Sequence, residues 1–313
     1  MAVLQESLPA LKSTGTAATS LHARLNRHAV GYALSAPALI LMALLLIGPV
    51  TMVIVMSFTD YALGETDWSF VGLANYREMI DSEDFWKSLR NTLVYVGIVV
   101  PVSVGLGLGV ALLIEGCTAW KSFYRAVYFL PVMATLIAMA IVWLVMMNPD
   151  FGLINLVLRG FGISGPNWLN DPATALLSLC LIGIWQALGF NMVLFMAGLT
   201  SIPKDLYAAA EMDGVATAFD RFRTVTWPLL GPVTMFVLVI TTIRSFQVFD
   251  TVHVLTQGGP SKSSEVLIYT MYAEGFEFFR SSYTAAVTVV FLSFIFLLTF
   301  VKARFIEKKV HYS

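Results

Sequence analysis

Arg244 is the residue of this sequence most conspicuously placed to bind a ligand. It directly follows the uncharged stretch Thr224–Ile243. A charged side chain at membrane depth is costly, and it usually pairs with another group or faces a water-filled cavity. Two interpretations remain open. Arg244 either holds an anionic ligand group such as a phosphate or sulfonate, or it is structural and pairs with Asp250 or with carbonyl groups at a helix end.

Other chemical groups are sparse. Cys117 and Cys180 lack the spacing of a metal or redox pair, and His253 and His311 stand apart from any cluster. No glycine-rich ATP-binding pattern with its Lys-Ser or Lys-Thr pair occurs. We therefore expect no catalytic residue, no metal site and no cofactor bound by this chain. The net charge of −1 gives no reason to expect a nucleic-acid partner.

Composition predicts a chain surrounded by lipid. Hydrophobic residues make up 58% and charged residues 12%, about half the roughly 25% charged residues of a soluble domain. A bilayer core takes roughly 20 helical residues, and helices satisfy their own backbone groups there. Six uncharged stretches are long enough: Ala29–Thr59, Asn91–Ile114, Ala126–Pro149, Pro172–Pro203, Thr224–Ile243 and Ser281–Val301.

These stretches predict an all-α polytopic membrane protein with six transmembrane helices. The transmembrane domain would cover residues 29–305, between an N-terminal tail of residues 1–28 and a C-terminal tail of residues 306–313. The first stretch is too long for the apolar core of a signal peptide, so we interpret it as a retained anchor. Twelve Lys and Arg residues fall on the side of the termini and six on the other. This asymmetry favours cytoplasmic termini.

Several local features refine the prediction. Gly48-Pro49 would kink or end the first helix. Gly105 and Gly109 form a small-residue face for close packing of the second helix. In the outer segments, short helices are expected near Leu73–Ile80 and Phe151–Leu158, since neither is long enough to span a membrane.

The connection from Thr200 to Pro228 differs from every other loop. Ser201 can cap a helix over Leu206–Met212, and Gly214 can adopt the left-handed conformation that ends it. A second helix, Thr217–Val225, must stop near Pro228. The pattern predicts a helix-turn-helix at the cytoplasmic face. From these residues alone it is either a docking element for another protein or a connector packed under the bundle.

This loop resembles the EAA motif of ABC importer permeases. The matching residues are Ala209, Ala210, Asp213, Gly214, Arg221, Phe222 and Pro228. Ala208 stands where the motif usually starts with glutamate, an acid follows at Glu211, and Trp227 replaces the leucine before the proline. Segments 84–92, 128–131, 148–155, 246–250 and 256–260 are similar to carbohydrate and glycerol-phosphate permeases. The resemblance covers roughly residues 30–313.

The resemblance implies a subunit of an ATP-driven, binding-protein-dependent importer in a bacterial inner membrane. It would form half of an alternating-access pathway for a sugar, glycoside or polyol derivative, with or without an anionic group. The implied partners are a second permease subunit in a heterodimer, two ATP-binding subunits that hold ATP and Mg, and an extracytoplasmic solute-binding protein. The loop 200–228 would couple this chain to the ATPase.

The resemblance also implies where the other sites lie. It places the solute pathway near the fourth and fifth helices, where an aromatic and polar lining is available from Trp185, Gln186, Asn191, Arg244 and Gln247. Trp185 equally suits a lipid interface, and Gln186 and Asn191 could bridge helices. The turn Gly258-Gly259-Pro260 looks like the outer-loop motif of these permeases, and it would contribute to docking of the binding protein.

Two other functional classes compete with this interpretation. An ion-coupled secondary transporter or channel would need intramembrane acids or histidines. None of the six predicted stretches contains an acid or a histidine, and Asp250 lies beyond the outer end of the fifth. A membrane-embedded enzyme would need a clustered nucleophile or metal set, which the sequence lacks.

Overall fold

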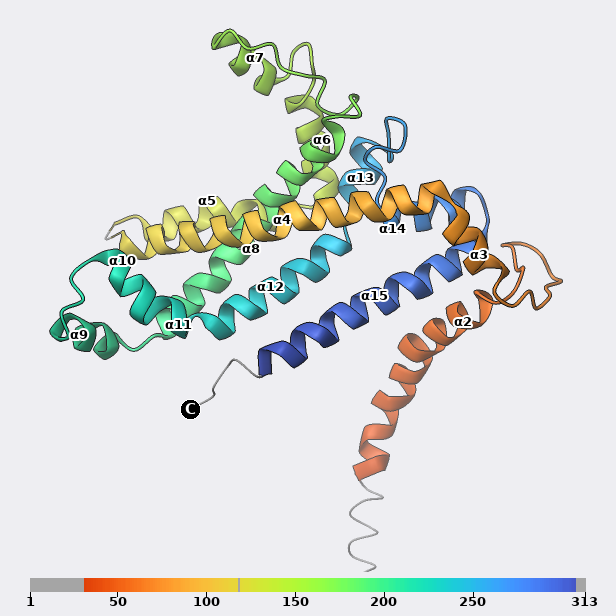
Figure 1. The fold of residues 1–313 in the computed structure, drawn as a ribbon, viewed down its shortest axis with the longest axis horizontal. Helices are drawn as coiled ribbons and strands as arrows, with labels where there is room; N and C mark the ends of the chain where they lie inside the picture. The colour runs from red at the N-terminus through yellow and green to blue at the C-terminus, as the bar shows by residue number, and fades with distance from the viewer. Residues whose placement is uncertain (1–30, 118, 308–313) are drawn as a thin grey trace, which may run out of the picture. The chain divides into compact units, whose positions relative to one another are not determined.

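The computed structural model describes residues 31–117 and 119–307, with the backbone alone for 301–307. The described residues are helical, apart from loops and one isolated bridge between Thr59 and Phe70, so the predicted all-α class is confirmed (Figure 1). They fall into two compact units, one ending at Val55 and one beginning at Met56.

The first unit is a helical segment that ends with α2. Helix continues over Gly31–Met56, with a π turn at Ala43–Ile47 followed by α2, Gly48–Met56. The expected interruption at Gly48-Pro49 is therefore wrong. In the π turn the Gly48 N–H donates to the Ala43 carbonyl, five residues back. This wider turn, directly before the proline, lets the helix continue although Pro49 has no N–H to donate.

The second unit is built around α4, Glu83–Gly116, and α8, Ala175–Ser201, which make its most extensive helix pairing. Helix α12, Gly231–Phe246, contacts both of them, and α15, Ser281–Glu307, contacts α12. The ribbon in Figure 1 shows α4 and α8 crossing above α12. Helix α4 begins eight residues before the predicted stretch, because Ser82 accepts the Phe85 N–H as a cap and acids occupy the first turn.

The third uncharged stretch is not one straight helix. It forms α5, Lys121–Met133, and α6, Leu136–Met146, which are bent by 99° at Ala134 and Thr135. Helix α5 packs along α8, whereas α6 packs against α13. Because two different neighbours bury the two halves, tertiary packing overrides the apolar continuity of the sequence.

Five described helical segments are long and apolar enough to cross a membrane, and the bent pair would make a sixth. The five are Gly31–Met56, Glu83–Gly116, Ala175–Ser201, Gly231–Leu255 and Ser281–Phe300. The last part of the fourth includes α13, Asp250–Leu255, which follows α12 after a short break. The described residues therefore provide six membrane spans if α5 and α6 together cross the membrane once.

Short helices occupy the connections. The two expected ones are confirmed as α3, Ala74–Asp81, and α7, Leu153–Gly160. Between α13 and α15 lie α14, Leu267–Tyr272, and a π turn at Ala273–Glu277. No helix was expected in this last segment, because elements of five and six residues are too short to show a helical period.

The expected glycine packing face of α4 is wrong in its residues. A Cβ at Gly105 or Gly109 would meet nothing within 4 Å, whereas one at Gly107 would lie 2.7 Å from the Cβ of Asn191 on α8. Residues four apart share a helix face, and a residue two positions away points to the other side. Gly107 therefore permits the close approach of α4 and α8.

Candidate functional site

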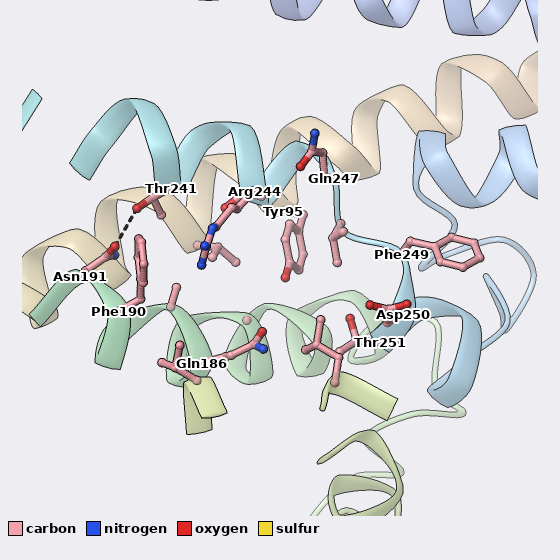
Figure 2. Close-up of a pocket in the computed structure, with 17 residues that line it drawn as sticks. Tyr95, Gln186, Phe190, Asn191, Thr241, Arg244, Gln247, Phe249, Asp250 and Thr251 are labelled. Atoms are coloured by element: carbon pink, nitrogen blue, oxygen red, sulfur yellow. Dashed lines mark hydrogen bonds between the residues drawn. The ribbon is translucent and has the colours of Figure 1, made fainter. Parts of the chain in front are cut away.

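A cavity of about 310 Å³ opens between α4, the break of α5 and α6, α8 and α12. Figure 2 shows its polar lining, with Gln186, Phe190 and Asn191 on α8 facing Thr241 and Arg244 on α12. The residues Gln247, Val248, Phe249, Asp250 and Thr251 continue the lining beyond the end of α12. This volume lies at the lower end of the roughly 300–1,000 Å³ of small-molecule sites.

Arg244 lies in this cavity without a partner acid among the described residues. Its guanidinium carbon lies 4.0 Å from the ring centroid of Phe190, a cation–π contact. Asp250 lines the same cavity, but no ion pair joins it to Arg244 in the part of the chain that the structure describes. The interpretation that Arg244 is a structural residue paired with Asp250 therefore does not hold.

Asn191 is mainly a bridge between helices. It is fully buried, donates to the Ser103 hydroxyl on α4 at 3.3 Å, and accepts from the Thr241 hydroxyl on α12 at 2.8 Å. One amide thus joins three helices at the edge of the cavity, which fixes the distance between the walls that carry Arg244 and Tyr95.

Two of the remaining predicted pathway residues line the cavity and one does not. Gln186 and Gln247 line the cavity, and Figure 2 shows them on opposite walls. Trp185 does not line this cavity, and its place in the solute pathway stays a prediction. Its ring packs edge-to-face on Trp143 with a centroid distance of 5.4 Å, against the core. Successive helical residues point about 100° apart, so Trp185 cannot share the direction of Gln186.

Tyr95, Phe190 and Asp250 also line the cavity and were not selected as pathway residues. Tyr95 lies within the apolar run of α4 and is buried against Gly183 of α8, whose lack of a side chain leaves room for the phenol. The spacing of Phe190 and Arg244 in the sequence gives no sign that the two meet. The contact depends on the antiparallel pairing of α8 and α12.

The coupling loop, residues 200–228, forms α9, Lys204–Met212, then α10, Ala218–Arg221. Gly214 has a φ of +89°, which confirms the expected left-handed residue between them. Ser201 does not cap α9. It lies at the end of α8, where its hydroxyl donates to the Gly198 carbonyl, and Pro203 takes the N-cap position without a side-chain bond.

The second helix of the coupling loop continues slightly beyond Pro228. A π turn at Phe222–Thr226 follows α10, and α11 spans Trp227–Leu229 before α12 begins. The Trp227 N–H donates to the Phe222 carbonyl, five residues back, so the proline is accommodated as in the first unit. The prediction of an end near Pro228 is correct within one residue.

One ion pair ties the two parts of the coupling loop together. The Arg221 guanidinium lies 2.5 Å from the Glu211 carboxylate, with both side chains substantially exposed. Asp213 ends α9, with its N–H donating to the Ala209 carbonyl. Ala209 and Gly214 are exposed, whereas Ala210 and Phe222 are half-buried. The structure therefore brings the predicted coupling residues into one surface element.

The Gly-Gly-Pro loop, residues 256–266, is bound firmly to α4. The Asn91 amide donates to the carbonyl groups of Lys262 at 3.1 Å and Glu265 at 2.9 Å. The Lys262 ammonium lies 2.6 Å from the Asp84 carboxylate. Gly258 has a φ of +77° and packs on the Tyr269 ring. Gly258, Gly259 and Pro260 thus form a turn whose position is set by α4.

Glu265 is the buried acid of this loop. Its carboxylate accepts from the Thr270 hydroxyl at 2.8 Å and lies 3.9 Å from the Lys262 ammonium. Burial raises the pKa of the Glu265 carboxyl, and the hydrogen bond from Thr270 and the charge of Lys262 oppose that rise.

Comparison with known proteins decides the family. The model of the binding-protein-dependent transport system inner membrane component matches residues 91–312. The chain belongs to this family. It is an inner-membrane permease component of binding-protein-dependent transport, which excludes the secondary transporter, channel and enzyme alternatives. The resemblance drawn from the coupling loop is confirmed.

Curated relatives align with this chain over most of their length. The chain is 35% identical to the sn-glycerol-3-phosphate transport system permease protein UgpA of Agrobacterium fabrum, over 90% of this chain and 96% of the relative. It is 32% identical to the trehalose/maltose transport system permease protein MalF of Thermococcus litoralis, over 87% and 90%. It is also 32% identical to the sulfoquinovosyl glycerol transport system permease protein SmoG of Agrobacterium fabrum, over 88% and 90%.

A solved structure confirms the fold. A chain of a bacterial alginate ABC transporter, crystallised with its alginate pentasaccharide-bound periplasmic protein, superposes with a TM-score of 0.78. The match covers 92% of this chain and 98% of that one at 22% identity. The ABC permease fold, with its helices in this order, is therefore established for the present chain.

Proposed function

We propose that this chain forms half of the alternating-access pathway of an ATP-driven importer for a sugar, glycoside or polyol derivative. The cavity between α8 and α12 carries the proposal, because the polar residues Gln186, Arg244 and Gln247 line it. Relatives named for glycerol phosphate, trehalose/maltose and sulfoquinovosyl glycerol support a polyhydroxylated solute.

The coupling loop is proposed to bind a separate ATPase subunit. The chain has no ATP-binding pattern of its own, so ATP and Mg would be held by that partner, in two copies. Large apolar side chains of the loop are exposed, with Met212 88% and Phe219 70% accessible. Exposed apolar groups of this size, set on a short ordered helix pair, suit insertion into a groove of a partner.

Two further partners are proposed, one beside this chain in the membrane and one at its outer face. A second permease subunit, in a heterodimer, would close the cavity. The Gly-Gly-Pro loop and the segments 60–90 and 148–172 would face outward and receive the solute-binding protein. Both termini would then lie in the cytoplasm, in accord with the excess of Lys and Arg in the segments on that side.

The glycine pair Gly214 and Gly162 provides a matched test of coupling. Both have positive φ, +89° and +78°, and a Cβ at either would meet nothing within 4 Å. Gly214→Val and Gly162→Val therefore impose the same kind of local backbone strain. We expect Gly214→Val to reduce co-purification of the ATPase at least tenfold, whereas Gly162→Val, on the proposed outer side, retains it. Equal effects of the two variants would contradict the coupling role.

A further inference from the structure

We propose that the cavity selects solutes that carry one anionic group beside several hydroxyl groups. Arg244 would bind the anion, a phosphate, sulfonate or carboxylate, and the hydroxyl groups would lie toward Gln186, Gln247 and Asp250. This inference rests on the proposed function, because it names the class of solute that the same cavity transports.

The contact with Phe190 leaves the Arg244 guanidinium free to bind an anion. A guanidinium that stacks on an aromatic ring uses its flat face, while its N–H donors point outward in its own plane. The 4.0 Å contact with the Phe190 ring has this effect. Figure 2 shows the Arg244 side chain extending from α12 toward α8 beside Phe190, into the space lined by Gln186. A planar fork of donors held in this way matches the oxygen atoms of a carboxylate or phosphate.

The position of Arg244 leaves its charge available to a solute. It is the fourteenth residue of the 25-residue segment Gly231–Leu255 and thus lies midway along it. Within the described part of the chain it forms no ion pair. Arg244 is exposed toward the cavity. A neutral sugar offers only hydroxyl dipoles to this cation, whereas an anionic solute supplies an opposite charge.

Asp250 and Arg244 place opposite charges in different parts of the cavity. It lies beyond the end of α12, as the first residue of α13, and Figure 2 places it on the far side of Tyr95 from Arg244. A carboxylate accepts hydrogen bonds from solute hydroxyl groups and repels a second anionic group. The cavity therefore suits a solute with an anion at one end and hydroxyl groups at the other, and disfavours one with anions at both ends.

Matched probes test this charge selection in the intact permease–ATPase complex, held in lipid nanodiscs. The probes are sn-glycerol 3-phosphate against glycerol and glucose 6-phosphate against glucose, with binding measured as ligand-induced thermal stabilisation of the complex. In wild type we expect each anionic probe to bind at least tenfold more tightly than its neutral partner. We expect Arg244→Gln to remove that preference, and Arg244→Lys to retain part of it.

Two further variants separate a binding role from a structural one. Asp250→Asn should retain binding of the singly anionic probes and improve binding of fructose 1,6-bisphosphate, which carries an anion at each end. Arg125→Gln, which removes an exposed arginine of α5 outside the cavity lining, should not change the binding of any probe. The unliganded melting temperature of Arg244→Gln should stay within a few degrees of wild type.

The proposal is overturned if wild type binds neutral and anionic probes equally, if it binds none of them, or if Arg244→Gln weakens both kinds alike. In each of these outcomes the Gly214→Val experiment still reports on the ATPase. Failure of charge selection with intact coupling would remove this inference alone, whereas loss of the Gly214 and Gly162 difference would remove the proposed function.

Discussion

The coupling loop and the Gly-Gly-Pro loop are both built around a left-handed glycine, yet they are held in opposite ways. In the coupling loop, one exposed ion pair between Glu211 and Arg221 joins two short helices, and Phe219 is 70% exposed. In the Gly-Gly-Pro loop, the amide of Asn91 binds two backbone carbonyl groups, and residues 264–267 are buried, with exposed fractions of 6% or less.

The two loops therefore differ in how far the rest of the chain fixes their conformation. The Gly-Gly-Pro loop has its conformation fixed by α4 before any partner arrives, which reduces the ordering cost of binding. The coupling loop packs Tyr207 and Val225 against the core but leaves Met212 and Phe219 exposed. If the loop binds the proposed ATPase, that partner would cover these exposed side chains.

The largest effect is expected from Asn91→Ala, which would remove the hydrogen bonds that hold the Gly-Gly-Pro loop on α4. The substitution leaves the carbonyl groups of Lys262 and Glu265 without a donor in a buried position, at a cost of about 1–3 kcal/mol each. Hydrogen exchange of the amides of residues 261–267 should accelerate at least tenfold. Asn170→Ala, at an exposed asparagine whose side chain meets only Asn167 among the bonds described, is the control and should change nothing. Unchanged hydrogen exchange in Asn91→Ala would show that the conformation of the loop does not depend on Asn91.

A smaller effect is expected from Glu265→Gln, and it depends on pH. Because burial raises the pKa of Glu265 in the folded protein, the contribution of this group to stability is complete below its unfolded pKa, near 4.5. It is lost as pH rises through the folded value. The melting temperature of wild type relative to Glu265→Gln should therefore fall across that window. The glutamine still accepts from Thr270, and Lys262 retains Asp84.

Glu274 pairs with Arg280, and its charge also raises the pKa of Glu265. The cleaner control for Glu265 is therefore Glu78→Gln, which changes the other acid that pairs with Arg280. The Glu78 side chain is 55% exposed, so this variant should not reproduce the fall. A difference between wild type and Glu265→Gln that stays constant from pH 4 to pH 8 would count against a raised pKa at Glu265.

The smallest effect on stability is expected from Glu211→Gln in the coupling loop. Both partners of the Glu211–Arg221 pair are more than 40% exposed, and exposed pairs contribute about 0–1 kcal/mol. The melting temperature should therefore change by a degree or two at most. Arg221→Lys retains the charge and serves as the matched variant. A loss of stability as large as that of Asn91→Ala would mean that the two loops are preorganised alike.

The sequence predicted the fold class and the chemistry of the loops better than the arrangement of the cavity. Low charge and long apolar stretches predicted the helices, and Gly214 and Pro228 placed the turn and end of the coupling loop within a residue or two. Arg244 was selected as a candidate binding residue because its charge is conspicuous in an apolar run, and it lines the cavity. Trp185 was selected for its suitability for sugars, which says nothing about which way it points, and it lies outside the cavity lining.

What the sequence by itself determined is local, since hydropathy, charge and backbone-specific residues act over one or two helical turns. The 99° bend between α5 and α6, the close packing at Gly107 in place of Gly105 and Gly109, and the meeting of Arg244 with Phe190 were decided only by tertiary structure. Each of them depends on which helices pack together across long separations. A uniformly apolar helix has no polar stripe to fix its rotation, so contacts with its neighbours select the residues that reach the cavity.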